Sequence, residues 1–253
     1  MSNNPAVPLL ELRDVKKKFG AVEAVAGISL SVYSGEVIAL LGDNGAGKSS
    51  LCKLVSGAYQ KDSGEILWNG TPVEISSPEV SNDLGITMMY QDLALVDHVD
   101  VPGNVFLGKE PSRKLFGFIP VLDQRKMKVE TQRLLDKVNI KIPDIERPVA
   151  RLSGGQRQAT GVARILQQDK ASLLIFDEPM AALGMQEEKK VIALIQNLKQ
   201  QGYAIMVVSH NLDHVFSVAD KIAVLHTGKV AGVVDAATAT REQIVGLVMG
   251  GKV

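Results

Sequence analysis

Eight residues at Gly42–Ser49 constrain the fold more than any other part of this sequence. Their order, Gly-Asp-Asn-Gly-Ala-Gly-Lys-Ser, fits the phosphate-binding pattern G-x-x-x-x-G-K-[ST]. The apolar run Val37–Leu41 precedes the loop and predicts a buried strand. A helix is expected from Lys48 to about Ser56. The sequence therefore predicts the strand–loop–helix unit of an α/β protein.

The chemistry of this loop follows from its glycines, its lysine and its hydroxyl. Glycine lets successive backbone N–H groups turn inward toward phosphate oxygens, and the start of the helix adds its dipole. Lys48 would lie between the β- and γ-phosphates, Ser49 would complete a Mg²⁺ site, and Ser50 would reach the α-phosphate. A glycine-rich connecting turn is the alternative, but the matched offsets and the context argue against it. The predicted nucleotide-binding residues are Gly42, Asp43, Asn44, Gly45, Ala46, Gly47, Lys48, Ser49 and Ser50.

The other apolar segments predict two kinds of sheet. Leu9–Phe19 and Gly27–Tyr33 alternate apolar and polar residues, as antiparallel strands with one wet face do. The step Asn69-Gly70 predicts a tight hairpin between Glu65–Trp68 and Thr71–Glu74. Four further apolar runs alternate with helices and predict a mainly parallel sheet: Gly85–Tyr90, Leu173–Phe176, Ala204–Ser209 and Ile222–Leu225. Helices are expected at Gly154–Gln168 and Gln186–Gln200, the second with Val191, Ala193, Leu194, Ile195 and Leu198 inward.

The stretch Asp92–Arg151 has a different texture, with several prolines and long polar segments. A helix is expected at Asp123–Val138 and a loop at Lys109–Pro120. The predicted fold is α/β: a P-loop NTPase core with a mainly parallel sheet, an N-terminal antiparallel β subdomain and an inserted α-helical subdomain. Residues 1–91 and 152–253 would form the nucleotide-binding core, and residues 92–151 the helical subdomain, within a single domain of 253 residues.

Composition narrows the range of partners. The 28 basic and 28 acidic residues cancel, which argues against a nucleic-acid partner. The single cysteine, Cys52, excludes an internal disulfide and fits a reducing cytoplasm. No signal-peptide pattern is present, and no apolar stretch approaches the roughly 18 residues that a membrane-spanning helix needs. A role at a membrane would therefore require docking onto other chains.

A pair of carboxylates ends one of the buried runs. Asp177 and Glu178 directly follow Leu173–Phe176, and ligands bind at the carboxyl ends of strands in such sheets. Asp177 would hold Mg²⁺ through water, and Glu178 would polarise the water that attacks the γ-phosphate. A solvated strand end is the alternative, against which the four preceding apolar residues and the upstream phosphate loop argue.

The run Leu152-Ser153-Gly154-Gly155-Gln156-Arg157-Gln158 distinguishes among phosphate-loop families. Ser153, Gly154, Gly155 and Gln156 offer a hydroxyl and free N–H groups at a helix start, which makes a second anion cradle. By itself the run also suits an ordinary capped helix. It resembles the signature motif of the ABC ATPases, the nucleotide-binding subunits of ATP-driven transporters. That resemblance implies a homodimer in which this cradle caps the γ-phosphate of ATP bound by the partner subunit.

Other positions match the same family. Gln91 resembles the glutamine that contacts Mg²⁺ and the attacking water, and His210 resembles the histidine that reaches the γ-phosphate. Phe19 lies where the family stacks an aromatic ring on adenine. The resemblance thus implies an ATPase with Lys48, Gln91, Glu178 and His210 as catalytic residues. Its metal residues would be Ser49, Gln91 and Asp177, and its cofactors ATP and Mg²⁺.

The resemblance also implies partners and a location. The helical insertion would press against an integral membrane permease through Leu93–Val105. Asn104-Val105-Phe106-Leu107-Gly108 is similar to ATPases of monosaccharide importers of the ribose, xylose and fructose type. Import of a sugar and an indirect partnership with a periplasmic substrate-binding protein would follow. The chain would then be peripheral, on the cytoplasmic face of the inner membrane.

One departure from the family pattern leaves alternatives open. Ala181-Ala182-Leu183-Gly184 matches a run that usually ends in an aspartate, and Gly184 supplies no carboxylate. A nucleotide-gated regulatory or assembly module with little turnover is therefore a second hypothesis. A non-transport ABC ATPase acting on DNA or ribosomes is a third, disfavoured by the lack of a long heptad stretch or a second phosphate loop.

Overall fold

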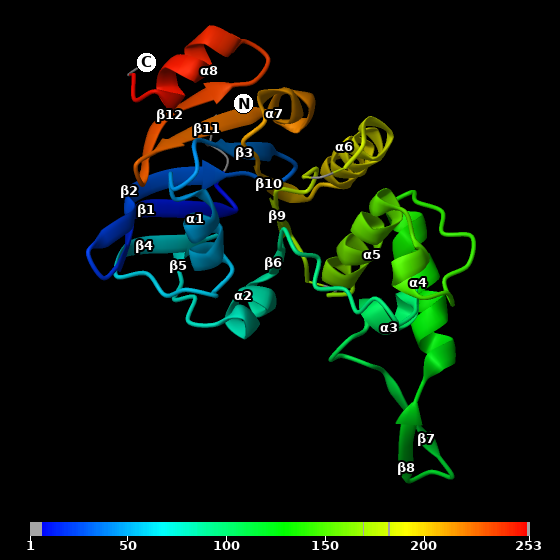
Figure 1. Ribbon diagram of the computed structural model, residues 1–253. Coiled ribbons are helices and arrows are strands. Elements are labelled where there is room, and N and C mark those ends of the chain that lie inside the picture. The colour runs from blue at the N-terminus through cyan, green and yellow to red at the C-terminus, as the bar shows by residue number, and fades with distance from the viewer. Residues whose placement is uncertain (1–6, 169, 182, 252–253) are drawn as a thin grey trace, which may run out of the picture. The chain divides into compact units, whose positions relative to one another are not determined.

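The computed structural model describes residues 7–168, 170–181 and 183–251, which form two compact units (Figure 1). The first unit comprises Met1–Gln91, Lys170–Pro179 and Leu198–Val253, and the second Asp92–Asp169 and Met180–Asn197. The expected division after Gln91 coincides with the observed one. The expected return to the core after Arg151 does not, because the following helix packs against the helices of the second unit.

A six-stranded sheet forms the centre of the first unit, in the order β12-β11-β3-β10-β9-β6. Its strands are β3 (Val37–Leu41), β6 (Ile86–Met89), β9 (Leu173–Asp177), β10 (Ala204–Val208), β11 (Lys221–His226) and β12 (Lys229–Asp235). All neighbouring pairs are parallel except β11 and β12, which are antiparallel. Strands β3, β9 and β10 are buried along their whole length, as expected for a parallel sheet covered on both faces.

The expected antiparallel sheet is confirmed, with four strands in the order β2-β1-β4-β5. These are β1 (Leu10–Phe19), β2 (Val22–Val32), β4 (Ser63–Trp68) and β5 (Thr71–Pro72). Asn69 and Gly70 have φ angles of 51° and 76°, so the tight turn between β4 and β5 forms as the sequence predicts.

Helices cover both faces of the central sheet. Helix α1 (Lys48–Val55) buries Leu51, Cys52 and Leu54 in the core between the two sheets. Helices α7 (Leu212–Val218) and α8 (Arg241–Val248) cover the opposite face. The short helix α2 (Pro78–Leu84), capped by Ser77, precedes β6. Among the residues that the structure describes, no helix has both the length and the apolarity to cross a bilayer.

The second unit is mainly helical. It contains α3 (Val101–Val105), α4 (Gln124–Lys137), a 3-10 turn (Val149–Arg151), α5 (Gly154–Leu166) and most of α6 (Met185–Gln200). In α6, Val191, Leu194, Ile195 and Leu198 are buried as predicted, but Ala193 is exposed. The expectation for Ala193 was wrong because its position is about 200° around the helix from Val191, on the opposite face.

The loop expected at Lys109–Pro120 was also wrong. β7 (Ser112–Leu115) and β8 (Ile119–Leu122) pair antiparallel there, with Leu115 opposite Ile119. Phe116 and Gly117 make the turn with φ angles of 52° and 84°. Two consecutive positive φ angles suit the tight turn that the N–H of Phe118 closes on the carbonyl of Leu115, and Gly117 is its one signal in the sequence.

Candidate functional site

The phosphate loop occupies the bend between β3 and α1, and two of its glycines leave no room for a side chain. Gly42 has a φ of 154° and Gly47 a φ of 100°. A Cβ atom on Gly47 would lie 2.4 Å from the carbonyl oxygen of Ala24, and one on Gly42 would lie 2.2 Å from that of Leu225. The N–H of Gly228 donates to the carbonyl of Ala46 at 3.1 Å and so supports the loop from the β11–β12 turn.

Lys48 folds back over this loop. Its Nζ atom donates to the carbonyl oxygens of Gly42, at 2.6 Å, and Asp43, at 3.0 Å, and the residue is only 7% exposed. Burial lowers the pKa of Lys48, while the negative charges of Glu178 and Asp177 act in the opposite direction. The loop therefore holds its ammonium group among carbonyl oxygens, next to the space where phosphates would lie.

Ser49 and Asp177 supply adjacent oxygen atoms beside the loop. Ser49 Oγ lies 3.4 Å from Asp177 Oδ1, and Asp177 is 7% exposed. Burial raises the pKa of Asp177, and the hydrogen bond from Ser49 opposes that shift. A carboxylate and a hydroxyl fit Mg²⁺, which takes only one or two carboxylates when substrate phosphates complete its shell.

Glu178 is held in a conformation that few glutamates adopt. Its φ is 52°, and its N–H donates to the carbonyl of Val208 at 3.0 Å. The Nδ1 atom of His210 lies 2.8 Å from Glu178 Oε1, and the glutamate side chain is 15% exposed against 67% for the histidine. Backbone strain of this kind persists where neighbouring contacts fix it and is typical of functional sites.

One hollow of the first unit, of about 740 Å³, brings most of the predicted residues together. The loop residues Asn44–Ser50 line it, with Gln91, Glu178 and His210. Val208, at the end of β10, lines it too, as do Val22–Ala24 and Thr227, none of which the sequence predicts as a site residue. These residues belong to no recognisable sequence motif, so their place beside the phosphate loop can be known only from the way the strands pair.

Phe19 does not line this hollow. Its ring packs edge-on against Tyr59, with the ring centroids 5.0 Å apart, and the residue is 41% exposed. Lys17 Nζ lies 5.6 Å from the centroid of the same ring. The aromatic surface is thus partly open, on the strand β1 that pairs with the lining strand β2.

The Ser-Gly-Gly run begins α5 in the second unit. The Ser153 hydroxyl accepts from the N–H of Gln156 at 3.3 Å, and Gln156 Oε1 accepts from the N–H of Ser153 at 3.1 Å. A Cβ on Gly154 would lie 2.8 Å from a methyl carbon of Leu183. The run therefore forms a capping box, as expected of an ordinary capped helix start. The matched run before α6 ends at Gly184, whose carbonyl accepts from the N–H groups of Glu187 and Glu188; Ala182 lies outside the described residues.

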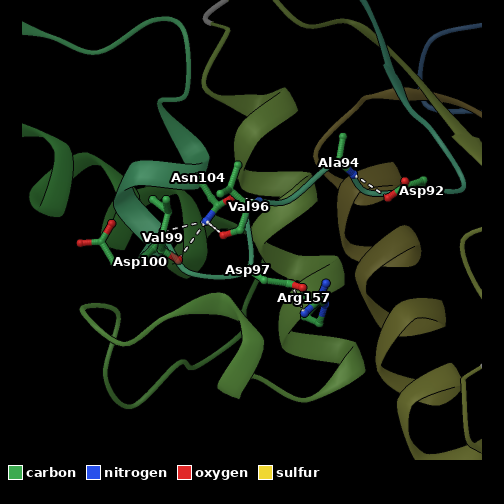
Figure 2. A network of polar contacts seen from close by, with 8 residues as sticks. All are labelled: Asp92, Ala94, Val96, Asp97, Val99, Asp100, Asn104 and Arg157. Atoms are coloured by element: carbon green, nitrogen blue, oxygen red, sulfur yellow. Dashed lines mark hydrogen bonds and ion pairs between the residues drawn. The ribbon is translucent and has the colours of Figure 1, made fainter.

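The segment after Gln91 is fixed by a buried amide that the sequence analysis did not single out (Figure 2). Asn104 is fully buried; its Oδ1 accepts from the N–H of Val96 at 2.7 Å. Its Nδ2 donates to the carbonyls of Val96, Val99 and Asp100 at 3.0–3.1 Å. One side chain thereby adds four hydrogen bonds to residues 96–100, beside the backbone bonds that Val96, Val99 and Asp100 make.

Two arginines tie the same segment to α5. Arg157 Nη1 lies 2.8 Å from Asp97 Oδ1 (Figure 2), and Arg164 Nη1 donates to the carbonyl of Ala94 at 2.9 Å. The helix that begins at the Ser-Gly-Gly run is therefore connected to residues 94–97 by an ion pair and a charge-assisted hydrogen bond.

Comparisons with known proteins agree on one family. The family model described as ABC transporter matches residues 25–181, more than half of the chain. A xylose/arabinose import ATP-binding protein of Sulfolobus acidocaldarius is 46% identical over 88% of this chain and 86% of its own length. A fructose import ATP-binding protein of Rhizobium meliloti is 37% identical, over 97% and 95%. A ribose import ATP-binding protein of Rubrobacter xylanophilus is 39% identical over 96% of this chain, which spans only 47% of that protein.

Solved structures agree on the fold. An ATP-binding cassette of an ABC transporter in its ADP conformation has a TM-score of 0.81 at 22% identity, and the match covers 96% of each chain. A second cassette, described as a dimer in a post-hydrolysis state bound to ADP and phosphate, has a TM-score of 0.73 at 21% identity over 90% of this chain and 98% of its own. Sequence and fold together show that the chain belongs to the ABC transporter family and is one of its ATP-binding ATPase subunits.

Proposed function

We propose that the chain hydrolyses ATP to drive import of a sugar through a separate membrane permease. The observation that carries the proposal is the hollow that the phosphate loop, Gln91, Glu178 and His210 line together. Hydrolysis needs a phosphate cradle, a base and a group that orients the base, and these side chains supply all three. The sugar is inferred from the relatives, which are described as xylose/arabinose, ribose and fructose import proteins.

In this proposal each residue has a separate task. The loop residues Gly42–Ser50 hold the triphosphate, with Lys48 between its β- and γ-groups. Ser49, Asp177 and Gln91 would hold Mg²⁺, which neutralises charge on the phosphate oxygens when bound. Glu178 would accept a proton from the attacking water, and His210, 2.8 Å away, would orient the glutamate. Phe19 would stack on adenine through the open part of its ring.

The proposed active form is a homodimer. Ser153, Gly154, Gly155 and Gln156 would cap the γ-phosphate bound by the partner subunit, using N–H groups at the start of α5. Support comes from the solved cassette of the same fold that is described as a dimer. The capping box is compatible with this role, because a helix start that is fixed in advance costs less ordering entropy when it binds an anion.

The proposed permease contact is the segment Leu93–Val105. Three side chains support this placement. Asn104 holds residues 96–100, which form neither helix nor strand, and Arg157 and Arg164 connect residues 94–97 to α5. Pressure from a permease could thus reach the signature run. The periplasmic binding protein would act only through the permease, and the chain would lie on the cytoplasmic face of the membrane.

Reconstitution tests this proposal. Proteoliposomes that contain the permease and this chain should accumulate labelled xylose, ribose or fructose only with ATP and Mg²⁺, with phosphate release in step. Steady ATP-gated association with negligible phosphate release would instead favour a regulatory module. Gly184 is the observation that favours that second candidate, since the usual carboxylate is missing there.

A further inference from the structure

The β7–β8 hairpin exposes a large apolar tip. Residues 112–120 are all exposed, and Phe116 and Phe118 are 80% and 76% exposed. Leu115 and Ile119, paired across the strands, are exposed as well. Both faces of the ribbon are thus open, and the described part of the chain leaves the tip uncovered. Two exposed phenylalanines so close together are unusual on a surface that only faces water.

Phe116 occupies a backbone position that disfavours it. Its φ of 52° lies in the left-handed region, and the N–H of Phe118 donates to the carbonyl of Leu115 at 3.3 Å to close the turn. Asparagine suits the first central position of such a turn far better than a bulky ring does. Because Phe116 is 80% exposed, packing against the described residues does little to compensate for that strain, which points to a contact outside the described part of the chain.

Behind the tip the charge is strongly positive, although the chain as a whole is neutral. Residues 109–128 contain six cations, Lys109, Arg113, Lys114, Arg125, Lys126 and Lys128, against two carboxylates, Glu110 and Asp123. Both carboxylates are engaged by backbone N–H groups, of Gly108 and Lys126 respectively. Among the described residues, Lys128 pairs with Glu146, and no ion pair is formed by Arg113, Lys114, Arg125 or Lys126.

Three of these cations and the carboxylate of Asp123 line a hollow at the base of the hairpin. It has a volume of about 760 Å³, and Arg113, Arg125 and Lys128 line it beside Leu122 and Val129. In the first turn of α4, moreover, basic residues replace the acidic ones that the helix dipole favours. Asp123, the N-cap of α4, already places one carboxylate at this helix start, where its Oδ1 accepts from the N–H of Lys126. A further anion beside Arg125 and Lys126 would stabilise the helix start more.

We propose that the hairpin docks on an anionic lipid bilayer, with Phe116 and Phe118 in the interface and Arg113, Lys114 and Arg125 at the lipid phosphates. A strand rises about 3.4 Å per residue, so Lys114 and Arg113 stand about 3 and 7 Å behind Leu115. An interfacial segment buries its apolar part about 5–10 Å deep, which leaves these cations at the level of the headgroups. Their long side chains can also extend toward phosphates while the stems stay apolar.

The pattern favours a lipid surface over a protein partner. A protein partner matches the shape of its site and pairs individual charges. Here an apolar tip has cations behind it on β7 and on the following helix, which suits a surface with many negative charges. The hairpin also begins seven residues after Val105, the end of the segment proposed to face the permease. This inference goes beyond the proposed transport function, because vesicle binding needs neither nucleotide hydrolysis nor a permease.

Co-sedimentation of the purified, nucleotide-free chain with vesicles tests the proposal. Vesicles of equal parts phosphatidylglycerol and phosphatidylcholine should bind the chain, and pure phosphatidylcholine vesicles should bind it far less. The double variant Phe116→Asn, Phe118→Ser should lose about tenfold or more in vesicle partition. Asparagine relieves the strain at residue 116, so the hairpin itself stays folded. Arg113→Gln with Lys114→Gln should weaken only the binding to anionic vesicles, and added salt should do the same.

Matched controls isolate the hairpin. Met249→Ser removes an apolar side chain that is 79% exposed in the first unit, and Lys141→Gln with Lys229→Gln removes two exposed cations elsewhere. Both controls should bind vesicles as the unmodified chain does. The proposal is overturned if the unmodified chain fails to bind anionic vesicles, or if the hairpin variants bind them as well as the controls. Hairpin variants that bind vesicles normally but lose stimulation by the permease would assign this surface to a protein contact instead.

Discussion

His210 Nδ1 lies 2.8 Å from Glu178 Oε1, and the two side chains come from the ends of adjacent parallel strands, β10 and β9. The glutamate is mostly buried while the histidine is open to the hollow. Since Glu178 also has a positive φ, its carboxylate is fixed both by its backbone and by an imidazole. A base held in this way needs little reorganisation before it accepts a proton.

Replacing Glu178 by glutamine should separate binding from hydrolysis. The amide keeps the size of the side chain and a contact to His210 but cannot accept the proton of the attacking water. We expect ATP affinity to persist, the ATP-bound dimer to accumulate, and phosphate release to fall about 10²- to 10⁴-fold. Glu242→Gln, at an exposed position of α8, serves as the control. Undiminished phosphate release in Glu178→Gln would remove Glu178 from its proposed role.

Replacing Asp177 by asparagine should stabilise the fold of the nucleotide-free chain while weakening its binding of Mg²⁺ with ATP. Burial raises the pKa of Asp177 in the folded chain above its unfolded value. The stability that this carboxyl contributes is therefore fully present below the unfolded pKa and is lost as pH rises through the folded pKa. The variant avoids that loss, so its Tm should exceed that of the unmodified chain near pH 7 by more than it does near pH 4.

Mg²⁺-dependent nucleotide binding provides the second measurement on this variant. Without the carboxylate, the apparent affinity for Mg²⁺ in the presence of ATP should fall about tenfold or more. Thermal unfolding in a chelator and titration with Mg²⁺ thus give opposite results for one substitution. If the variant had a lower Tm than the unmodified chain at neutral pH, the charged form of Asp177 would stabilise the fold. That result would contradict the raised pKa that burial gives this carboxyl.

Patterns that depend on neighbours in sequence predicted the loop, the strand ends and the capped helix correctly. Val37–Leu41 is a strand with the expected bounds, and Asn69-Gly70 makes the expected turn. The edge strand β12 and helices α2, α7 and α8 are not predicted by the sequence, because they are short segments whose structure depends on tertiary packing. The sequence does not predict the hairpin at 112–122, because neither strand has a buried face that would appear as alternating apolar and polar residues, and its turn lacks asparagine.

The site shows the same division. Lys48, Ser49, Asp177 and Glu178 carry their chemistry in short motifs that the sequence displays directly. The wall formed by Val22–Ala24 depends on the pairing of β1 with β2 and on the close approach of Gly47 to Ala24. Asn104 resembles any polar residue of a short helix until its buried position is known. Sequence alone could not place these residues because long-range pairing determines their neighbours.

Gly47→Ala tests whether the loop depends on close backbone packing. The new Cβ would lie 2.4 Å from the carbonyl oxygen of Ala24, so the loop must shift. We expect ATP affinity to fall about tenfold or more, because several N–H groups would no longer point at phosphate. Gly202→Ala is the matched control: its φ of 89° is similar, and no atom lies within 4 Å of its Cβ position. That variant should cost about 1 kcal/mol of stability and leave ATP binding intact.

Asn104→Ala should destabilise the second unit more than most single substitutions do. The change removes four hydrogen bonds to residues 96–100 and the packing of a fully buried side chain. The three carbonyls each keep a backbone N–H donor, so the N–H of Val96 is the group that loses its partner. The loss should be about 2–4 kcal/mol of unfolding free energy. Denaturant unfolding measures it, with Gln124→Ala as a control at an exposed position of α4 outside the network. Equal stability of the two variants would mean that Asn104 does not organise this segment.

Arg157→Gln should weaken the coupling between permease contact and ATP hydrolysis, with little effect on the free energy of unfolding. The ion pair with Asp97 is partly exposed, with side chains 33% and 54% accessible, so its loss should cost less than about 1 kcal/mol. The pair nevertheless joins the proposed permease segment to the helix that carries the signature run. Basal hydrolysis should therefore change little, while stimulation by the permease should fall. Asp97→Asn should give the same loss, and the double variant should be no worse than either single one, because both remove one interaction. Additive losses in the double variant would show that Arg157 and Asp97 act separately, and the proposed connection would not hold.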